Sequence, residues 1–117
     1  MTDNVPSPVA FSTLGLPTFL LESLNTLGYE EATPIQVETI PALLEGHDVV
    51  GIAQTGTGKT AAFALPALAS LDFKKRVPQI LVLCPTRELS MQVADAFRTY
   101  AKSSAGCTVV TLCGGND

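Results

Sequence analysis

Apolar residues recur at helical spacing in the first part of the chain, in two stretches that predict amphipathic helices. The first stretch begins at about Pro17 and ends at Gly28, which supplies a left-handed stop. The second follows the N-cap residue Thr33 and ends at Gly46, and Pro41 inside it is expected to kink or shorten the helix. The two predicted helices are joined by a short loop.

Beyond the second helix, short apolar runs alternate with helical stretches. The runs predict strands at 48–52, 79–84 and 107–113, and the stretches between them predict helices at 59–71, which Pro66 perturbs, and 86–102. Alternation of this kind favours a three-layer α/β fold with a parallel sheet and right-handed crossovers. Because small parallel sheets with bare edges are normally extended and covered, we expect a partial domain, truncated after its third strand.

Composition narrows the class of protein. The chain has 117 residues, of which 46% are hydrophobic and 15% charged, so it fits one domain or a piece of one. Its longest apolar stretches fall far short of the roughly 20 residues that span a bilayer. Residues 1–10 lack the pattern of a secretory signal and are expected to form a flexible tail. These features predict a cytoplasmic protein without membrane contact.

The cysteines and charges indicate which kinds of binding site the chain carries. The three cysteines have no CxxC spacing, which argues against a metal site or a disulfide framework and favours buried reduced thiols. His47 is expected to be a solvated loop residue. The net charge is −4, yet all seven Lys and Arg lie in residues 59–117, so a polyanion is expected to bind there. Residues 74–76, Lys-Lys-Arg, are interpreted as a solvated loop.

The strongest chemical signal is AQTGTGKT, residues 53–60. It lies between a predicted strand and a predicted helix, where Gly56 and Gly58 permit backbone turns that aim amide groups at phosphates. Lys59 can reach the β and γ phosphates, and the Thr60 hydroxyl can bind Mg²⁺. These two residues are the predicted catalytic residues. The pattern indicates a loop that binds a nucleoside triphosphate.

Two alternatives to that interpretation exist. The loop departs from GxxxxGK[ST] at its first position, where Ala53 stands, and TGTG could be a flexible turn, although a turn alone does not explain Lys-Thr at the start of a helix. Gly56, Gly58 and Ala61 also fit the dinucleotide fingerprint of oxidoreductases. That fold needs an acid at the end of the second strand, where this chain has Pro85.

Several motifs in order resemble the amino-terminal part of a DEAD-box ATP-dependent RNA helicase. They are Phe11, GYEEATPIQ at 28–36, AQTGTGKT, PTRELS at 85–90, and a final glycine pair. Within that family the chain is most similar to bacterial cold-shock members. The resemblance implies that residues 11–117 form the first part of a RecA-like domain that binds ATP and Mg²⁺.

The resemblance assigns GYEEATPIQ to the family's adenine-reading motif. Tyr29 would stack on the base, the Gln36 amide would pair with adenine N6 and N7, and Phe11 would pack beside that pocket. Spacing alone favours core positions for the aromatics and a surface position for the glutamine. The predicted nucleotide-binding residues are Phe11, Tyr29, Thr33, Gln36, Ala53, Gln54, Thr55, Gly56, Thr57, Gly58, Lys59 and Thr60.

The resemblance also implies contacts with the RNA backbone. PTRELS matches a motif that contacts RNA, so Pro85, Thr86 and Arg87 are predicted to hold phosphate, and Gly114 and Gly115 to allow close approach of the RNA backbone. Arg87 could instead pair with a nearby acid, and the glycines could form a plain turn. Backbone contacts of this kind are sequence-tolerant.

Departures from the family pattern limit the predicted activity. Ala32 replaces the usual Pro and Ser90 the usual Ala, and neither change removes a contacting group. The Asp-Glu-Ala-Asp motif, the Ser-Ala-Thr motif and the second RecA-like domain are absent from this sequence, so the chain alone is expected not to hydrolyse ATP. The parent is predicted to be an ATP-dependent RNA helicase that works with its second RecA-like domain. The alternative is a non-catalytic fragment that binds nucleotide or RNA.

Overall fold

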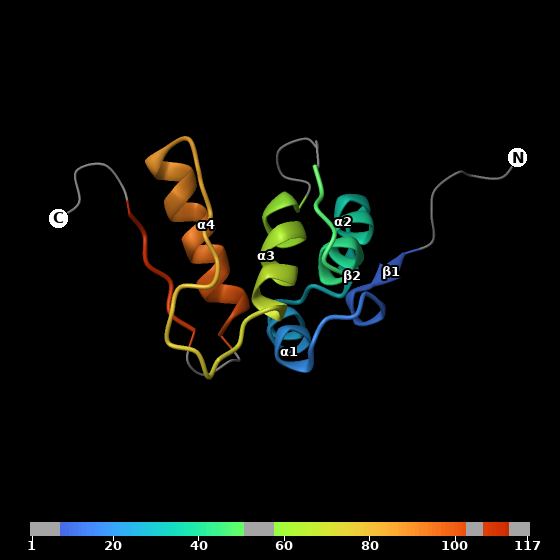
Figure 1. The fold of residues 1–117 in the computed structure, drawn as a ribbon. Coiled ribbons are helices and arrows are strands. Elements are labelled where there is room, and N and C mark those ends of the chain that lie inside the picture. The colour runs from blue at the N-terminus through green and yellow to red at the C-terminus, as the bar shows by residue number, and fades with distance from the viewer. Residues whose placement is uncertain (1–7, 51–57, 103–106, 113–117) are drawn as a thin grey trace, which may run out of the picture.

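The computed structural model describes residues 8–50, 58–102 and 107–112 (Figure 1). The elements are short strands, a 3-10 turn and longer helices. In chain order they are β1 (Val9–Ala10), η1 (Phe11–Thr13), α1 (Thr18–Thr26), β2 (Glu31–Ala32), α2 (Pro34–Leu44), α3 (Lys59–Ala69) and α4 (Arg87–Tyr100). Each helix predicted from the hydrophobic pattern is present.

The helices begin and end near proline and glycine residues that favour helix ends. α1 begins directly after Pro17, and Gly28, two residues beyond its end, adopts the left-handed conformation with φ +80° that an L side chain rarely takes. α2 does not stop at Pro41 but continues to Leu44. A proline removes one N–H and leaves the neighbouring hydrogen bonds intact; the amide of Glu45 still donates to the Pro41 carbonyl at 3.1 Å.

A small antiparallel sheet joins β1 to β2. Val9 lies opposite Ala32, and Ala10 lies opposite Glu31. The amide of Phe11 then donates to the carbonyl of Glu30 at 3.1 Å. The structure thus places Val9 and Ala10, the end of the predicted tail, in a strand, while residues 1–7 lie outside the described chain.

The predicted parallel strands differ from the structure. In their described parts, residues 48–50, 79–84 and 107–112 form no strand pairing, and the paired strands of the described chain are β1 and β2. Extended backbone becomes a strand only when a neighbour accepts its hydrogen bonds. The segment at 79–84 has no such neighbour among the described residues. On one face its Leu81 and Leu83 are 83% and 85% exposed, while Ile80 and Cys84 on the other face pack against the core.

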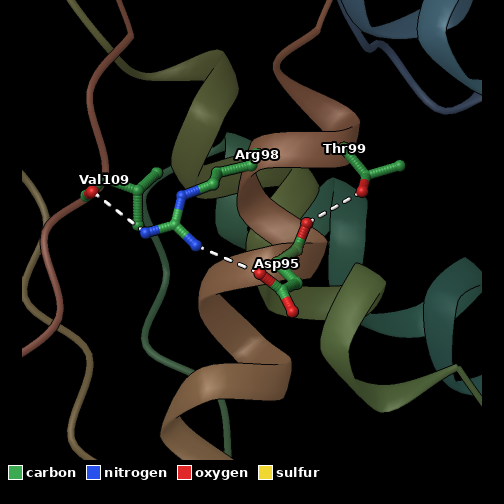
Figure 2. Close-up of polar contacts among 4 residues, drawn as sticks. All are labelled: Asp95, Arg98, Thr99 and Val109. Atoms are coloured by element: carbon green, nitrogen blue, oxygen red, sulfur yellow. Dashed lines mark hydrogen bonds and ion pairs between the residues drawn. The ribbon is translucent and has the colours of Figure 1, made fainter.

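The segment at 107–112 is attached to α4 by a guanidinium. Figure 2 shows Arg98 donating through Nη1 to Asp95 Oδ1 at 3.1 Å and through Nη2 to the Val109 carbonyl at 3.3 Å. Thr99 donates to the backbone carbonyl of Asp95 at 2.8 Å. One arginine thereby links the helix to the backbone of a segment that has no strand neighbour among the described residues.

The hydrophobic core is centred on α3. This helix lies between α2 and α4, and α1 closes one end of the group (Figure 1). Leu65 and Leu68 of α3 are fully buried, as are Leu20 of α1 and Ile40 of α2. Phe63 of α3 meets Phe97 of α4 with ring centroids 6.1 Å apart. Burial on several sides explains why α3 is apolar around most of its circumference. None of the described helices has the length and apolarity needed to cross a membrane.

Candidate nucleotide and RNA site

The beginning of α3 supplies the part of the phosphate loop that the structure describes. Gly58 precedes the helix with φ +86° and ψ +21°, a left-handed conformation suited to glycine. Its carbonyl accepts the amide of Ala62 at 3.1 Å and closes the first turn. Lys59 is exposed and Thr60 half-buried at the helix start, where unsatisfied amides and the positive end of the helix dipole favour an anion.

Gln36 of α2 is bound to this turn. Its side-chain Nε2 donates to the Gly58 carbonyl at 3.2 Å, and its Oε1 accepts the backbone amide of Thr33 at 2.9 Å. The second bond is the glutamine half of a capping box at the start of α2. Gln36 is only 5% exposed, so these bonds hold a buried amide in one orientation. The amide retains one further N–H and one further acceptor lone pair for a ligand.

The space around Gly58 is too small for any side chain. A Cβ at this position would overlap Gln36 Nε2 and lie 3.1 Å from Thr33 Oγ1. That hydroxyl is buried and faces the Gln36 backbone amide in the capping box, without a hydrogen bond of good geometry among the described residues. It can therefore still bond to a ligand beside the loop. The tight glycine cradle and this weakly bonded hydroxyl fit a bound nucleotide.

Phe11 and Tyr29 share a different cavity. It has a volume of about 300 Å³, and its lining also includes Leu21 and Leu24 of α1. Phe11 is buried, whereas Tyr29 is 50% exposed and available for stacking. Gln36 does not line this cavity. The structure therefore brings Phe11 together with Tyr29, and Gln36 together with Gly58, but it does not bring all of them into one cavity.

A larger groove begins at the phosphate loop. Its volume is about 790 Å³, and it runs between α2, α3 and α4. Gly58, Lys59 and Thr60 line one part of it, and the described lining contains no Asp or Glu. Val82, Leu83 and Cys84 line another part, so the segment that leads into PTRELS lies across the groove from the loop.

Thr86 and Arg87 lie at the start of α4. Thr86 is the N-cap, and its Oγ1 accepts the amide of Leu89 at 3.1 Å. Its hydroxyl proton stays available to donate to a phosphate. Pro85 and Arg87 are exposed, and α4 is long enough for its first amides to add a second set of donors. The placement agrees with a phosphate contact, and the sequence could predict it because Thr followed by Arg-Glu marks a helix start.

The remaining predicted residues lie outside the described parts of the chain. These are Ala53, Gln54, Thr55, Gly56, Thr57, Gly114 and Gly115. Their predicted roles stay predictions.

Burial raises the pKa of two side chains, Tyr100 and Cys107. It raises the pKa of Tyr100 above 10.0, to which the nearby Tyr29 adds a smaller upward contribution. Burial also raises the pKa of the Cys107 thiol. Tyr100 lines the groove, so its phenol keeps its proton well into the alkaline range and can act as a hydrogen-bond donor.

Comparison with known families gives a match over most of the chain. Residues 33–117 match the DEAD/DEAH box helicase family. The chain is 53% identical over 115 residues to the ATP-dependent RNA helicase DeaD of Haemophilus influenzae, covering 98% of this chain and 18% of that protein. It is 58% identical over 105 residues to the protein of the same name from Escherichia coli strain K12, covering 90% of this chain and 17% of that protein.

Solved structures give the same match in three dimensions. Prp28 from Chaetomium thermophilum bound to ADP superposes with a TM-score of 0.81 and 41% identity, over 99% of this chain and 30% of that one. Dbp5 from S. cerevisiae, bound to RNA and ADP BeF3, gives a TM-score of 0.75 and 32% identity, over 81% of this chain and 25% of that one. The fold is therefore the RecA-like α/β fold that the sequence predicts. This chain spans less than a third of either solved structure.

Proposed function

We propose, from the premise that this chain belongs to the DEAD/DEAH box helicase family, that it supplies the ATP-binding part of an ATP-dependent RNA helicase. Relatives that carry that name are more than half identical to it. The chain spans less than a fifth of their length, so the complete activity belongs to a longer protein. The family match also argues against a dinucleotide-binding oxidoreductase.

The observation that carries the proposal is the bond from Gln36 Nε2 to the Gly58 carbonyl. It sets an amide that can pair with adenine beside the turn that leads into Lys59. One molecule that has both a purine and a phosphate tail can then contact both groups. The buried Thr33 hydroxyl lies beside the same turn and adds a third contact.

Lys59 and Thr60 would act on the phosphate end. The Lys59 ammonium, exposed at the start of α3, neutralises charge on the β and γ phosphates. The Thr60 hydroxyl would hold Mg²⁺, which when bound neutralises further phosphate charge. The first amides of α3 position the phosphates by hydrogen bonds.

RNA would bind at the start of α4. The Thr86 hydroxyl, the Arg87 guanidinium and the first amides of the helix are donors suited to phosphate and do not read bases. Gly114 and Gly115 would let the backbone approach closely. We expect a second RecA-like domain of the parent protein to complete both the ATP and the RNA sites.

The experiment is competition for a fluorescent ATP analogue bound to the 117-residue chain. ATP is expected to displace the analogue at least about tenfold better than GTP, because Gln36 pairs with adenine and not with guanine. ATP should also displace it better than NAD, which carries the same adenine but lacks the γ phosphate that Lys59 contacts. Gln36→Ala should abolish the preference for ATP over GTP. Gln79→Ala is the matched control, since Gln79 also makes two hydrogen bonds but lies far along the chain. Equal displacement by ATP, GTP and NAD would refute the proposal.

A further inference from the structure

The segment between α3 and residue 79 is a braced turn. The side chain of Gln79 accepts the Asp72 amide through Oε1 and donates to the Asp72 carbonyl through Nε2, both at 2.9 Å. The Asp72 carboxylate accepts the amide of Lys74 at 3.0 Å, and the Asp72 carbonyl also accepts the amide of Lys75 at 3.1 Å. These bonds fix the backbone on which the next residues are displayed.

The turn is also attached to the body of the fold. Phe73 contacts Phe19 of α1 edge to face, with ring centroids 5.5 Å apart and ring planes 80° apart. The backbone of residues 72–79 is therefore held at both its ends and on α1.

Three consecutive cations project from the turn. Lys74, Lys75 and Arg76 are exposed, and none has an ion pair with a residue of the described chain. They are three of the seven Lys and Arg of a chain whose net charge is −4. Side chains of like charge at adjacent positions repel one another, and an anion that binds them relieves this repulsion. A preorganised cationic turn is suited to bind a polyanion.

The turn is remote from the candidate nucleotide site. It follows the end of α3, whereas Gly58 precedes the start of α3, and the helix of 11 residues between them is about 16 Å long. Figure 1 shows the turn and α1 at the same end of the molecule, away from the start of α3. A ligand on the turn therefore does not compete with a nucleotide or with a phosphate held by Arg87.

We propose that Lys74, Lys75 and Arg76 form a second contact for the phosphate backbone of single-stranded RNA. The choice of RNA rests on the proposed function. An anionic membrane would face the net negative charge of the whole chain, whereas a flexible strand reaches the local cluster alone. The contact is independent of sequence, because the turn offers charges and no free aromatic ring for a base.

The test is fluorescence anisotropy of a labelled oligouridine titrated with the 117-residue chain at several salt concentrations. For the triple variant Lys74→Gln, Lys75→Gln, Arg76→Gln, we expect affinity at low salt to fall at least about tenfold, and the slope of log affinity against log salt to fall by about 2, for three lost phosphate contacts. The double variant Lys74→Arg, Lys75→Arg retains the charge and should bind as the parent chain does. Gln79→Ala, which removes only the bracing, should give a smaller loss and leave the slope unchanged.

Two further arms separate this contact from the proposed function. Arg87→Gln is expected to weaken RNA binding additively with the triple variant, because the two sites are far apart. If Arg87→Gln weakens binding and the triple variant does not, the second contact is refuted and the proposed function stands. If the triple variant loses binding to phosphatidylserine vesicles but not to RNA, the second contact is likewise refuted. If the chain binds no oligouridine at all, the RNA part of both proposals fails.

Discussion

Gln36 donates a hydrogen bond to the carbonyl of Gly58, a residue 22 positions later in the chain. The same carbonyl closes the first turn of α3, so the start of α2 and the start of α3 are held together by one atom. A carbonyl oxygen has two lone pairs and can accept both bonds. Movement of either helix start is therefore transmitted to the other.

Gly58→Ala should damage this junction more than an ordinary glycine substitution does. Both the positive φ and the overlap of a Cβ with Gln36 Nε2 oppose the new side chain. We expect a loss of about 2–4 kcal/mol in the free energy of unfolding, measured by urea denaturation. Gly46→Ala is the control, because Gly46 has φ +90° but open space around its Cβ position, and it should cost only about 1–2 kcal/mol. Equal losses would mean that the contact with Gln36 contributes nothing.

Lys59→Ala should separate binding from stability. The side chain is exposed, so the free energy of unfolding should change by no more than about 0.5 kcal/mol. Affinity for Mg²⁺-ATP, measured by calorimetry, should fall about 10- to 100-fold through loss of a charge-assisted hydrogen bond. Lys102→Ala removes an exposed lysine after α4 and serves as the control. The role of Lys59 is wrong if both variants bind equally well.

Thr86→Ala should remove the N-cap of α4. The Leu89 amide would lose its acceptor, at a cost of about 1 kcal/mol in unfolding free energy. Thr86→Ser keeps an oxygen at the same place and should restore stability. If RNA affinity falls for Thr86→Ala and recovers for Thr86→Ser, the hydroxyl group supports both the helix cap and RNA binding. If only stability changes, Thr86 does not contact RNA.

Tyr100 should titrate above the ordinary range of a tyrosine phenol. The chain has two tyrosines, so Tyr29→Phe leaves one phenol whose ionisation can be followed by ultraviolet absorbance. Burial, the larger cause, keeps the pKa of Tyr100 above 10.0, while the smaller contribution of Tyr29 disappears in the variant. Because the folded pKa is the higher one, this group favours the folded state below the unfolded pKa, and that contribution is lost as pH rises through the folded pKa. A midpoint at or below 10.0 would contradict the burial of this ring.

The 117-residue chain alone should not turn over ATP. No Asp or Glu lines the described part of the groove beside Lys59, so no carboxylate there can orient an attacking water. Phosphate release with Mg²⁺-ATP and RNA is expected to stay at background. Turnover clearly above background, lost in Lys59→Ala, would show that another group supplies the base.

Local chemistry explains which parts of the fold the sequence predicted. The helices were predicted because their ends carry local signals, such as Thr33 before α2, Thr86 before α4 and Gly28 after α1. The parallel strands were predicted from apolar runs, and runs alone carry no information about pairing partners. In the described residues, 79–84 and 107–112 are extended and unpaired, since pairing depends on neighbours distant in sequence.

The candidate site was predictable in its parts but not in its assembly. Motif spacing identified Gln36, Gly58 and Arg87 individually. The capping role of Gln36 was readable in principle, because Thr followed three residues later by Gln is a capping-box pattern. The bond from Gln36 to Gly58 was not readable, since it depends on how α2 packs against α3. The bracing of Asp72 by Gln79 was missed for the same reason.

We propose that Gln36 and the start of α3 bind the same nucleotide. Its most direct test is an NMR titration that follows the side-chain amide of Gln36 and the backbone amide of Lys59. With a non-hydrolysable ATP analogue and Mg²⁺, we predict that both resonances shift with the same dissociation constant, whereas inorganic tripolyphosphate shifts Lys59 far more than Gln36. If the ATP analogue shifts Lys59 and leaves the Gln36 side chain unchanged, the two residues do not share a ligand and the proposed nucleotide site is wrong.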